Sequence, residues 1–182
     1  MKIMIASDIH GSEFYCSQLI EAFNREKPDK LLLLGDILYH GPRNDLPENY
    51  APKTVIQMLN EIKESIICVR GNCDTEVDQA VLDFPIMAEY CVLYFDGHLV
   101  YATHGHHFNE SNPPKLNKGD ILLNGHTHVS GCCVHPGFTY MNPGSVSIPK
   151  MGSRHSYMIY ENEKFYWKEL NGEEFNRYLL PL

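Results

Sequence analysis

The sequence lacks the marks of a membrane protein or a secreted protein. No apolar run approaches the ~18 residues that a membrane-spanning helix needs, and too few apolar residues precede Asp8 for the apolar region of a signal peptide. The six cysteines include no C-x-x-C pair and follow no regular spacing. We therefore expect a cytoplasmic protein with reduced thiols and no membrane partner.

Positive charge is also scarce. The chain has 15 Lys and Arg residues against 23 Asp and Glu residues, which gives a net charge of −8. Phosphate backbones are neutralised by Lys and Arg, so this balance argues against a nucleic-acid partner. Internal repeats and low-complexity segments are absent as well. A chain of 182 residues, 43% of them hydrophobic, can bury a core without disulfides, and we predict a single domain over residues 1–182.

The first half of the chain alternates strands with helices. Short apolar runs typical of buried strands lie at residues 2–6, 30–34 and 66–69. Between them, Ser12 can cap a helix that ends before Pro28, and residues 53–64 have the apolar spacing of a second helix. This order predicts a parallel sheet, in which ligands bind at the carboxyl ends of the strands.

The second half shows hairpins instead. Two pairs of strand-like runs are each separated by a tight-turn signal, and a third run stands alone. They cover residues 87–96 with 98–103, 156–161 with 164–169, and 121–123. The long stretch 37–52 contains three prolines and reads as a rim loop. The fold class is therefore α/β, with parallel units first and antiparallel hairpins after them.

Five predicted strand ends carry side chains of the kind that bind metals. They are Asp8 with His10, Asp36, Asn72, His104 with His106, and His126 with His128. Residues two apart in extended backbone point to the same side, so each closely spaced pair can bind from one strand end. Oxygen and imidazole ligands without thiolates suit Mn²⁺, Fe²⁺, Co²⁺, Ni²⁺ or Zn²⁺ and fit poorly to a structural zinc site.

In this order, the motifs resemble those of the calcineurin-like metallophosphoesterase superfamily. The run from His40 to Asn44 and the run Asn142-Pro-Gly-Ser145 make the chain similar to the small bacterial YfcE-type phosphodiesterases. The resemblance covers residues 2 to about 160. It implies an α/β/β/α sandwich, in which two facing mixed β-sheets are flanked by helices, and it suggests a homo-oligomer, either a dimer or a tetramer.

The resemblance also implies two divalent cations. One would be held by Asp8, His10, Asp36 and His128, and the other by Asp36, Asn72, His104 and His126. Asp36 would therefore bridge the two cations. We predict manganese, with Zn²⁺, Fe²⁺, Co²⁺ and Ni²⁺ as alternatives that the same ligands accept.

Such a pair of cations predicts a phosphoric ester hydrolase. Two cations ~4 Å apart lower the pKa of a bridging water and clamp both oxygens of an in-line displacement. We expect the bridging hydroxide to attack the phosphorus of a small phosphodiester directly, without a covalent enzyme intermediate. A phosphomonoesterase on the same centre is the main alternative. A scaffold without catalysis, as found in membrane-trafficking complexes of this fold, is the other alternative.

Cys73 marks a departure from the superfamily. Most members have a histidine there, paired with the following aspartate, which protonates the leaving group or steadies the attacked phosphate. A thiol with a pKa near ~8.5 is poorly suited to donate a proton at neutral pH, so we expect substrates with acidic leaving groups. The predicted catalytic residues are Asn72, Cys73, Asp74 and His106. His106 is the substitute proton donor or orients His104, and Cys73 alternatively fills space behind Asn72.

Two residues of the rim loop are candidates for substrate binding, Arg43 and Asn44. A guanidinium offers a planar fork that suits phosphate oxygens. The alternative is a solvated charge at the rim. Elsewhere, Cys132 and Cys133 are adjacent, and we expect one to point inward and one outward, with a strained vicinal disulfide as the alternative.

Overall fold

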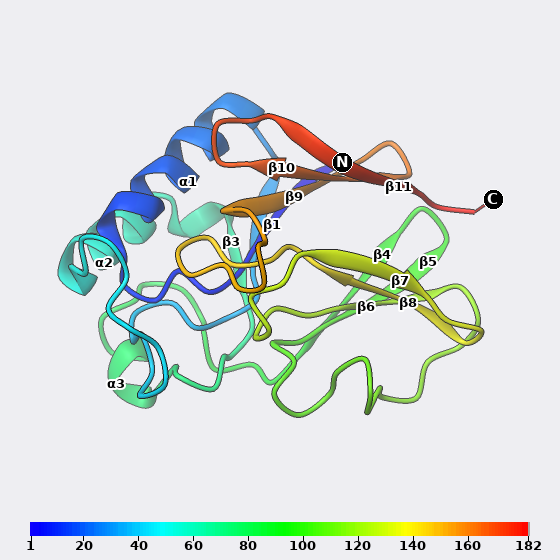
Figure 1. Ribbon diagram of the computed structural model, residues 1–182, viewed down its shortest axis with the longest axis horizontal. Helices are drawn as coiled ribbons and strands as arrows, with labels where there is room; N and C mark the ends of the chain where they lie inside the picture. The colour runs from blue at the N-terminus through cyan, green and yellow to red at the C-terminus, as the bar shows by residue number, and fades with distance from the viewer. Residues whose placement is uncertain (182) are drawn as a thin grey trace.

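The computed structural model describes residues 1–181, and two mixed β-sheets form its centre (Figure 1). The six-stranded sheet has the order β11-β10-β9-β1-β2-β3. Its strands are β1 (Lys2–Ala6), β2 (Lys30–Leu33), β3 (Ile66–Cys68), β9 (Ser156–Glu161), β10 (Lys164–Glu169) and β11 (Glu174–Leu179). β1, β2 and β3 run parallel, whereas β9, β10 and β11 run antiparallel to their neighbours.

The five-stranded sheet has the order β4-β5-β6-β8-β7. Its strands are β4 (Cys91–Phe95), β5 (His98–Ala102), β6 (Asp120–Leu123), β7 (Gly131–Val134) and β8 (Phe138–Asn142). The three central strands β5, β6 and β8 are parallel, and the two edge strands are antiparallel to them. Both predicted hairpins, β4 with β5 and β9 (Ser156–Glu161) with β10 (Lys164–Glu169), are therefore confirmed. The parallel pairing of β5, β6 and β8 escaped prediction, because loops rather than helices connect these strands.

The helices found in residues 1–181 all lie between residues 13 and 79, and α1 and α2 lie beside the six-stranded sheet (Figure 1). They are α1 (Glu13–Glu26), α2 (Pro52–Glu61) and the short α3 (Glu76–Gln79), with a 3₁₀ turn at Lys63–Ser65. The Ser12 side chain accepts the backbone N–H of Tyr15, which confirms the predicted cap of α1. None of the helices in residues 1–181 has the length and apolar character to cross a membrane.

One strand shows how the core is divided. In β2, Leu31 and Leu33 pack on the helix side of the sheet, whereas Leu32 and the following Leu34 pack between the two sheets. A strand buried on both faces reads as a continuous apolar run, and this is why residues 30–34 were recognisable from the sequence. The buried Trp167 indole donates to the carbonyl of Asn142 at 2.7 Å and so joins β10 to the end of β8.

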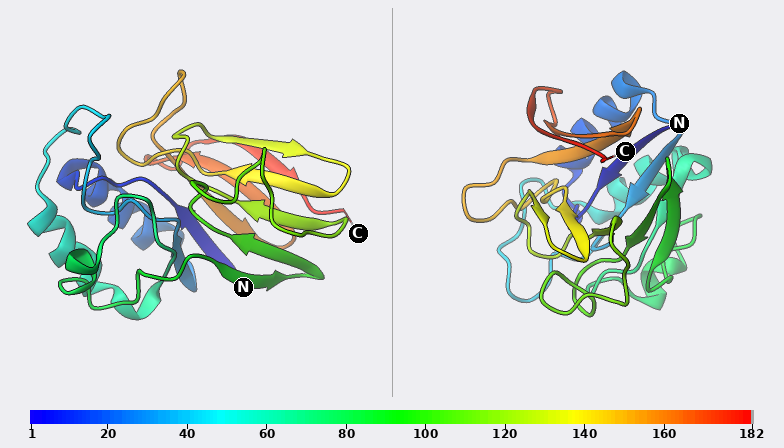
Figure 2. Two further views of the ribbon diagram at one scale, coloured as in Figure 1. Left: turned by 90° about the horizontal axis from the view of Figure 1, so that it is seen from below. Right: turned by 90° about the vertical axis from the view of Figure 1, so that its right-hand side faces the viewer.

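The two facing mixed sheets confirm the predicted fold class (Figure 2). Several smaller elements escaped prediction: β7, β8, β11 and α3. α3 has only four residues and depends on a capping box between Thr75 and Asp78.

The prediction for the two adjacent cysteines of β7 is confirmed. Cys132 is half-buried and Cys133 is exposed, so one points inward and one outward. All six cysteines are free thiols, so the vicinal disulfide is not formed.

A buried carboxylate fastens the end of α1 to the six-stranded sheet. Glu26 accepts from the Lys168 ammonium at 2.6 Å, the Lys2 ammonium at 2.9 Å and the Tyr157 hydroxyl at 3.0 Å. Its side chain is only 8% exposed. Burial alone would raise the pKa of Glu26, but Lys168, Lys2 and Tyr157 outweigh burial and lower the pKa to about 2.

This contact predicts a pH-dependent contribution to stability. A carboxylate whose pKa falls on folding stabilises the fold fully above its ordinary pKa of 4.5, and that contribution disappears as the pH falls towards 2. We expect Glu26→Gln to lower the free energy of unfolding by ~1–3 kcal/mol at neutral pH, and by progressively less below pH 4.5. Urea unfolding across this range measures the effect. The exposed Glu64→Gln is the control, and a Glu26→Gln deficit that does not change with pH would contradict the prediction.

Candidate metal centre

The fold brings the predicted strand-end side chains from both sheets to one place. Asp8 and His10 follow β1, and His128 follows β6. The His128 Nε2 lies 3.2 Å from Asp8 Oδ1, and the His10 Nε2 lies 3.6 Å from the same oxygen. The two Nε2 atoms are 3.2 Å apart. Three potential ligand atoms therefore surround a single point.

A second group of ligand atoms lies beside the first. His104 Nε2 lies 3.0 Å from Asn72 Oδ1 and 3.4 Å from Asp36 Oδ2. The His126 Nδ1 is 3.2 Å from the His104 Nε2. Asp36 Oδ2 is also 3.8 Å from His10 Nε2, so this carboxylate lies between the two groups. The structure thus brings together all seven residues that the sequence put forward as ligands.

Unusual backbone geometry positions these side chains. Five of them have positive φ, in the left-handed region that few residues other than glycine adopt: Asp8 (59°), His10 (49°), Asp36 (56°), His126 (63°) and His128 (61°). Glycine is required close by, because a Cβ at Gly71 would collide with the Asp36 carboxylate. Such strain at several neighbouring positions is typical of a functional site.

The orientation of three imidazole rings is set by backbone carbonyls. His10 Nδ1 donates to Tyr39 O at 2.7 Å, and His128 Nδ1 donates to Ile148 O at 2.6 Å. His104 Nδ1 donates to Leu34 O at 2.7 Å. A carbonyl can only accept, so each ring carries its proton on Nδ1 and directs Nε2 into the cluster.

These contacts fit a pair of divalent cations. With both Nδ1 protons committed to carbonyls, the 3.2 Å contact between the Nε2 atoms of His10 and His128 needs either an added proton or a cation between them. Within residues 1–181, the buried Asp8 Oδ1 has no hydrogen-bond donor. Imidazole nitrogens and carboxylate oxygens are ligands that divalent transition metals accept.

The pKa shifts of Asp8 and His104 also indicate that the cluster favours a bound positive charge. Burial alone would raise the pKa of Asp8, but His10 and His128 outweigh burial and hold the pKa well below its usual range. Burial would likewise lower the pKa of His104, yet the Asp36 carboxylate raises that pKa to about 9. The negative charge of two buried carboxylates thus favours positive charge in the cluster, as a proton or as a metal.

Asp74 fastens two of the loops together. It is 1% exposed, and it accepts backbone N–H groups from Gly71 at 2.7 Å, Asp36 at 2.8 Å and Ile37 at 2.9 Å. Both oxygens are therefore occupied by backbone donors. This geometry favours a positioning role, and the expected catalytic role of Asp74 stays a prediction.

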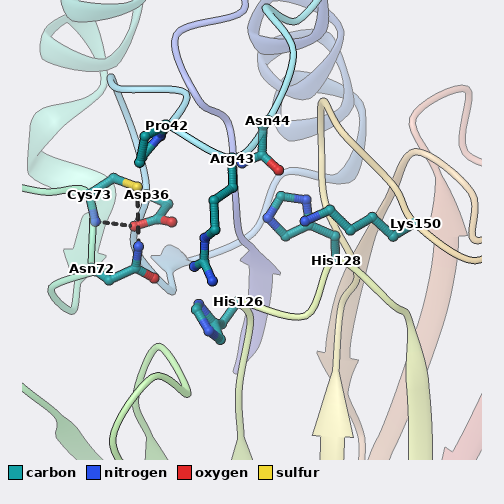
Figure 3. Close-up of a pocket in the computed structure, with 10 residues that line it drawn as sticks. Asp36, Pro42, Arg43, Asn44, Asn72, Cys73, His126, His128 and Lys150 are labelled. Carbon is teal, nitrogen blue, oxygen red and sulfur yellow. Dashed lines mark hydrogen bonds between the residues drawn. The ribbon is translucent and has the colours of Figure 1, made fainter.

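Cys73 packs directly against the cluster. Its backbone N–H donates to Asp36 Oδ1 at 2.8 Å, and its Sγ accepts from the Asn72 amide at 3.2 Å (Figure 3). The Sγ lies within 4.8 Å of ligand atoms of His10 and Asp36. Burial raises the pKa of the thiol far above its ordinary range, and the Asp36 carboxylate raises it further.

A small pocket of about 40 Å³ opens onto these residues. The Arg43 guanidinium extends into it between Asn72, His126 and His128, and Asn44 lies at its edge (Figure 3). Asn44 also holds the rim loop closed, because its amide donates to His40 O at 2.7 Å. Lys150 lines the pocket too, and the sequence analysis missed it, since an isolated lysine in a loop carries no pattern.

His106 is not among the described residues that line this pocket. Its ring lies 5.5 Å from that of His104 and 6.3 Å from that of His126, centroid to centroid. Burial lowers the pKa of His106 to about 4, with help from the neighbouring His104 and His107. Its role as proton donor stays a prediction, and its ring is packed against that of the predicted ligand His104.

Comparison with known proteins identifies the family. The model of the calcineurin-like phosphoesterase superfamily domain matches residues 1–164. Phosphodiesterase YfcE of Escherichia coli (strain K12) is 47% identical over 163 residues, which cover 90% of this chain and 89% of that protein. The solved structure of the E. coli phosphoesterase YfcE matches with a TM-score of 0.96 and 42% identity over 100% of both chains.

A more distant relative shares the fold alone. Vacuolar protein sorting 29 from Cryptosporidium parvum is 19% identical and matches with a TM-score of 0.63, over 98% of this chain and 97% of that chain. The superfamily match spans most of the chain, and the E. coli relative is close in sequence and in structure. The chain therefore belongs to the calcineurin-like phosphoesterase superfamily, in the YfcE-type branch that its motifs predicted.

Proposed function

We propose that this phosphoric ester hydrolase is a phosphodiesterase that uses two divalent cations to cleave small phosphodiesters. The observation that carries the proposal is the 3.2 Å contact between the Nε2 atoms of His10 and His128, beside the unpartnered Asp8 Oδ1. The E. coli relative that is 47% identical is named a phosphodiesterase, which supports the class of ester.

The proposed ligands divide between two sites. Asp8, His10, Asp36 and His128 would hold one cation, and Asp36, Asn72, His104 and His126 the other. The intermediate position of Asp36, 3.8 Å from His10 Nε2 and 3.4 Å from His104 Nε2, supports the bridging role. Manganese remains our proposal for the cation, because oxygen and imidazole donors without thiolate suit it.

Charge at the centre supports an anionic substrate. When bound, divalent cations supply an activated water and positive charge opposite the phosphate oxygens. The proposed ligands include only two carboxylates, Asp8 and Asp36, so two divalent cations leave the centre positive. Arg43 and Lys150 add two further positive charges at the pocket. A protein of net charge −8 can therefore bind a phosphate ester at this point.

The chain's own residues orient the reactants. Asp74 and the backbone N–H of Cys73 hold Asp36 in place from both sides. The Arg43 guanidinium lies between the histidines of both proposed sites, where it can donate to phosphate oxygens (Figure 3). We propose direct attack on phosphorus, because Cys73 is the one thiol that lines the described pocket, and both burial and the Asp36 carboxylate raise its pKa.

Protonation of the leaving group is the weak part of this centre. The Cys73 thiol has a strongly raised pKa, and His106 lies outside the pocket formed by described residues. A group with a pKa far from neutrality transfers a proton poorly during catalysis. We therefore propose substrates whose alcohols are already acidic enough to leave without help.

Two other functions remain distinguishable by experiment. A phosphomonoesterase would hydrolyse monoesters faster than diesters in a substrate survey. A scaffold would hydrolyse neither class of ester with any divalent metal, and the vacuolar protein sorting relative of the same fold resembles this chain too distantly to argue for that role. We further propose that residues 1–182 form one domain, that the protein is cytoplasmic, and that it assembles as a dimer or tetramer.

Asp36→Asn tests the bridging carboxylate. The change preserves the size of the side chain and removes the charge shared between the proposed sites. We expect fewer than two bound metals per chain by elemental analysis, and a loss of diester hydrolysis of about 100-fold or more. Asp83→Asn, which alters an exposed ion pair with Lys63, is the matched control and should resemble the wild type. Full activity with two metals bound in Asp36→Asn would refute the proposed centre.

Cys73→His tests the missing proton donor. An imidazole at this position should raise kcat/KM by ~100-fold for diesters with poor leaving groups, and should change little for p-nitrophenyl esters. The measurement is the dependence of kcat/KM on leaving-group pKa. Cys73→Ser is the control, because it preserves size without adding a base. An unchanged dependence in Cys73→His would favour a purely space-filling role for the thiol.

A further inference from the structure

A second hollow, of about 380 Å³, lies beside the candidate metal centre. It is formed by the rim loop, α2 and α3. Its walls are mainly apolar and aromatic: Leu38, Tyr39, Tyr50, Ile56, Val77 and Val81. Three of these side chains are notably exposed, Tyr39 at 43%, Val81 at 44% and Val77 at 76%. Apolar groups gathered around a concave surface mark a place where another apolar group binds.

The hollow begins where the metal centre ends. Cys73 lines both the hollow and the small pocket at the centre. Its Sγ lies within 4.8 Å of ligand atoms of His10 and Asp36. The backbone of Tyr39 accepts the His10 Nδ1 proton at 2.7 Å, so one wall of the hollow is attached to a proposed ligand. Cys73 is therefore a wall that the two spaces share.

The two spaces differ in size and in chemistry. The pocket at the centre has about 40 Å³ and is lined by charged and polar groups, including Arg43 and Lys150. Its charged and polar lining suits a phosphate rather than an apolar organic group. The hollow is far larger and mostly apolar, and Lys53, Thr75 and Asp78 add a few polar groups to its lining.

Gly41 lies against Cys73, at the boundary between the two spaces. It has φ +81°, and a Cβ there would lie 3.2 Å from the Cys73 Sγ. Any side chain at this position would therefore crowd the boundary that Cys73 forms. The absence of a side chain at Gly41 therefore leaves space beside the Cys73 Sγ.

We propose that the hollow binds one organic arm of the phosphodiester, and that this arm is flat and aromatic, such as an aryl group or a nucleobase. This inference rests on the proposed function, since it places the phosphate at the metal centre. The two tyrosines offer ring surfaces to a flat group, and the valines and Ile56 offer apolar contact. The polar side chains of the lining can meet heteroatoms of the ring.

The test compares two phosphodiesters that differ only in their arms, diphenyl phosphate and dimethyl phosphate. Calorimetry measures the Kd of each for the metal-loaded protein. We expect the wild type to prefer diphenyl phosphate, and Tyr39→Ala to reduce that preference by about tenfold, as loss of a stacking partner does. The Tyr39 backbone carbonyl, which contacts His10, is unchanged by this substitution. Val81→Gln is a second variant and should reduce the preference in the same direction.

Tyr94→Ala is the matched control, because Tyr94 is a 71% exposed tyrosine on β4 of the other sheet. Its preference for diphenyl phosphate should equal that of the wild type. With bis(p-nitrophenyl) phosphate as substrate, Tyr39→Ala should raise KM by about tenfold and change kcat much less.

The outcomes separate the two proposals. The protein could hydrolyse diesters without preferring aromatic arms, or with a preference that Tyr39→Ala and Val81→Gln do not change. Either result would overturn the aromatic subsite but not the phosphodiesterase activity. Selective binding of diphenyl phosphate that depends on Tyr39, without hydrolysis of any diester, would support the subsite and overturn the proposed activity.

Discussion

The candidate centre depends on how one carboxylate, that of Asp36, is held where two loops meet. Its backbone N–H donates to Asp74, and its Oδ1 accepts the N–H of Cys73, both at 2.8 Å. Gly71 allows the two loops to approach this closely, because a Cβ there would occupy the space of the carboxylate. The loops after β2 and β3 are therefore fastened to each other through protein groups alone, and the histidines from the other strand ends are arranged around a fixed point.

This arrangement costs stability, which the core has to supply. Each non-glycine residue held in a sparsely populated backbone region costs on the order of 1–3 kcal/mol, and five of the proposed ligands are held so. Two buried carboxylates and several inward-facing imidazoles add a cost of desolvation. The apolar layers on both faces of β2 provide the opposing term. The site is thus a strained region within a well-packed frame, as expected where chemistry sets the geometry.

The sequence predicted the parts of this molecule that repeat a local pattern. Strands buried on both faces, such as β2, appear as continuous apolar runs, and closely spaced ligands such as Asp8 and His10 appear at their ends. Roles that depend on distant contacts stayed hidden. Nothing local distinguishes Lys150 from other surface lysines. The hydrogen bonds from the loop after β2 to Asp74 join residues that are separated by 37 or 38 positions in the sequence. β11 escaped because its residues are mostly exposed and lack a clear alternation.

The two sheets share no paired strands within residues 1–181, and this separation has a mechanical consequence. The proposed ligands come from both sides: Asp8, His10, Asp36 and Asn72 follow strands of one sheet, and His104, His126 and His128 follow strands of the other. A cation bound by such a set would act as a cross-link between the halves of the sandwich. Its binding energy would then oppose sliding and separation of the two sheets. The same cation that takes part in the chemistry would therefore also stabilise the fold.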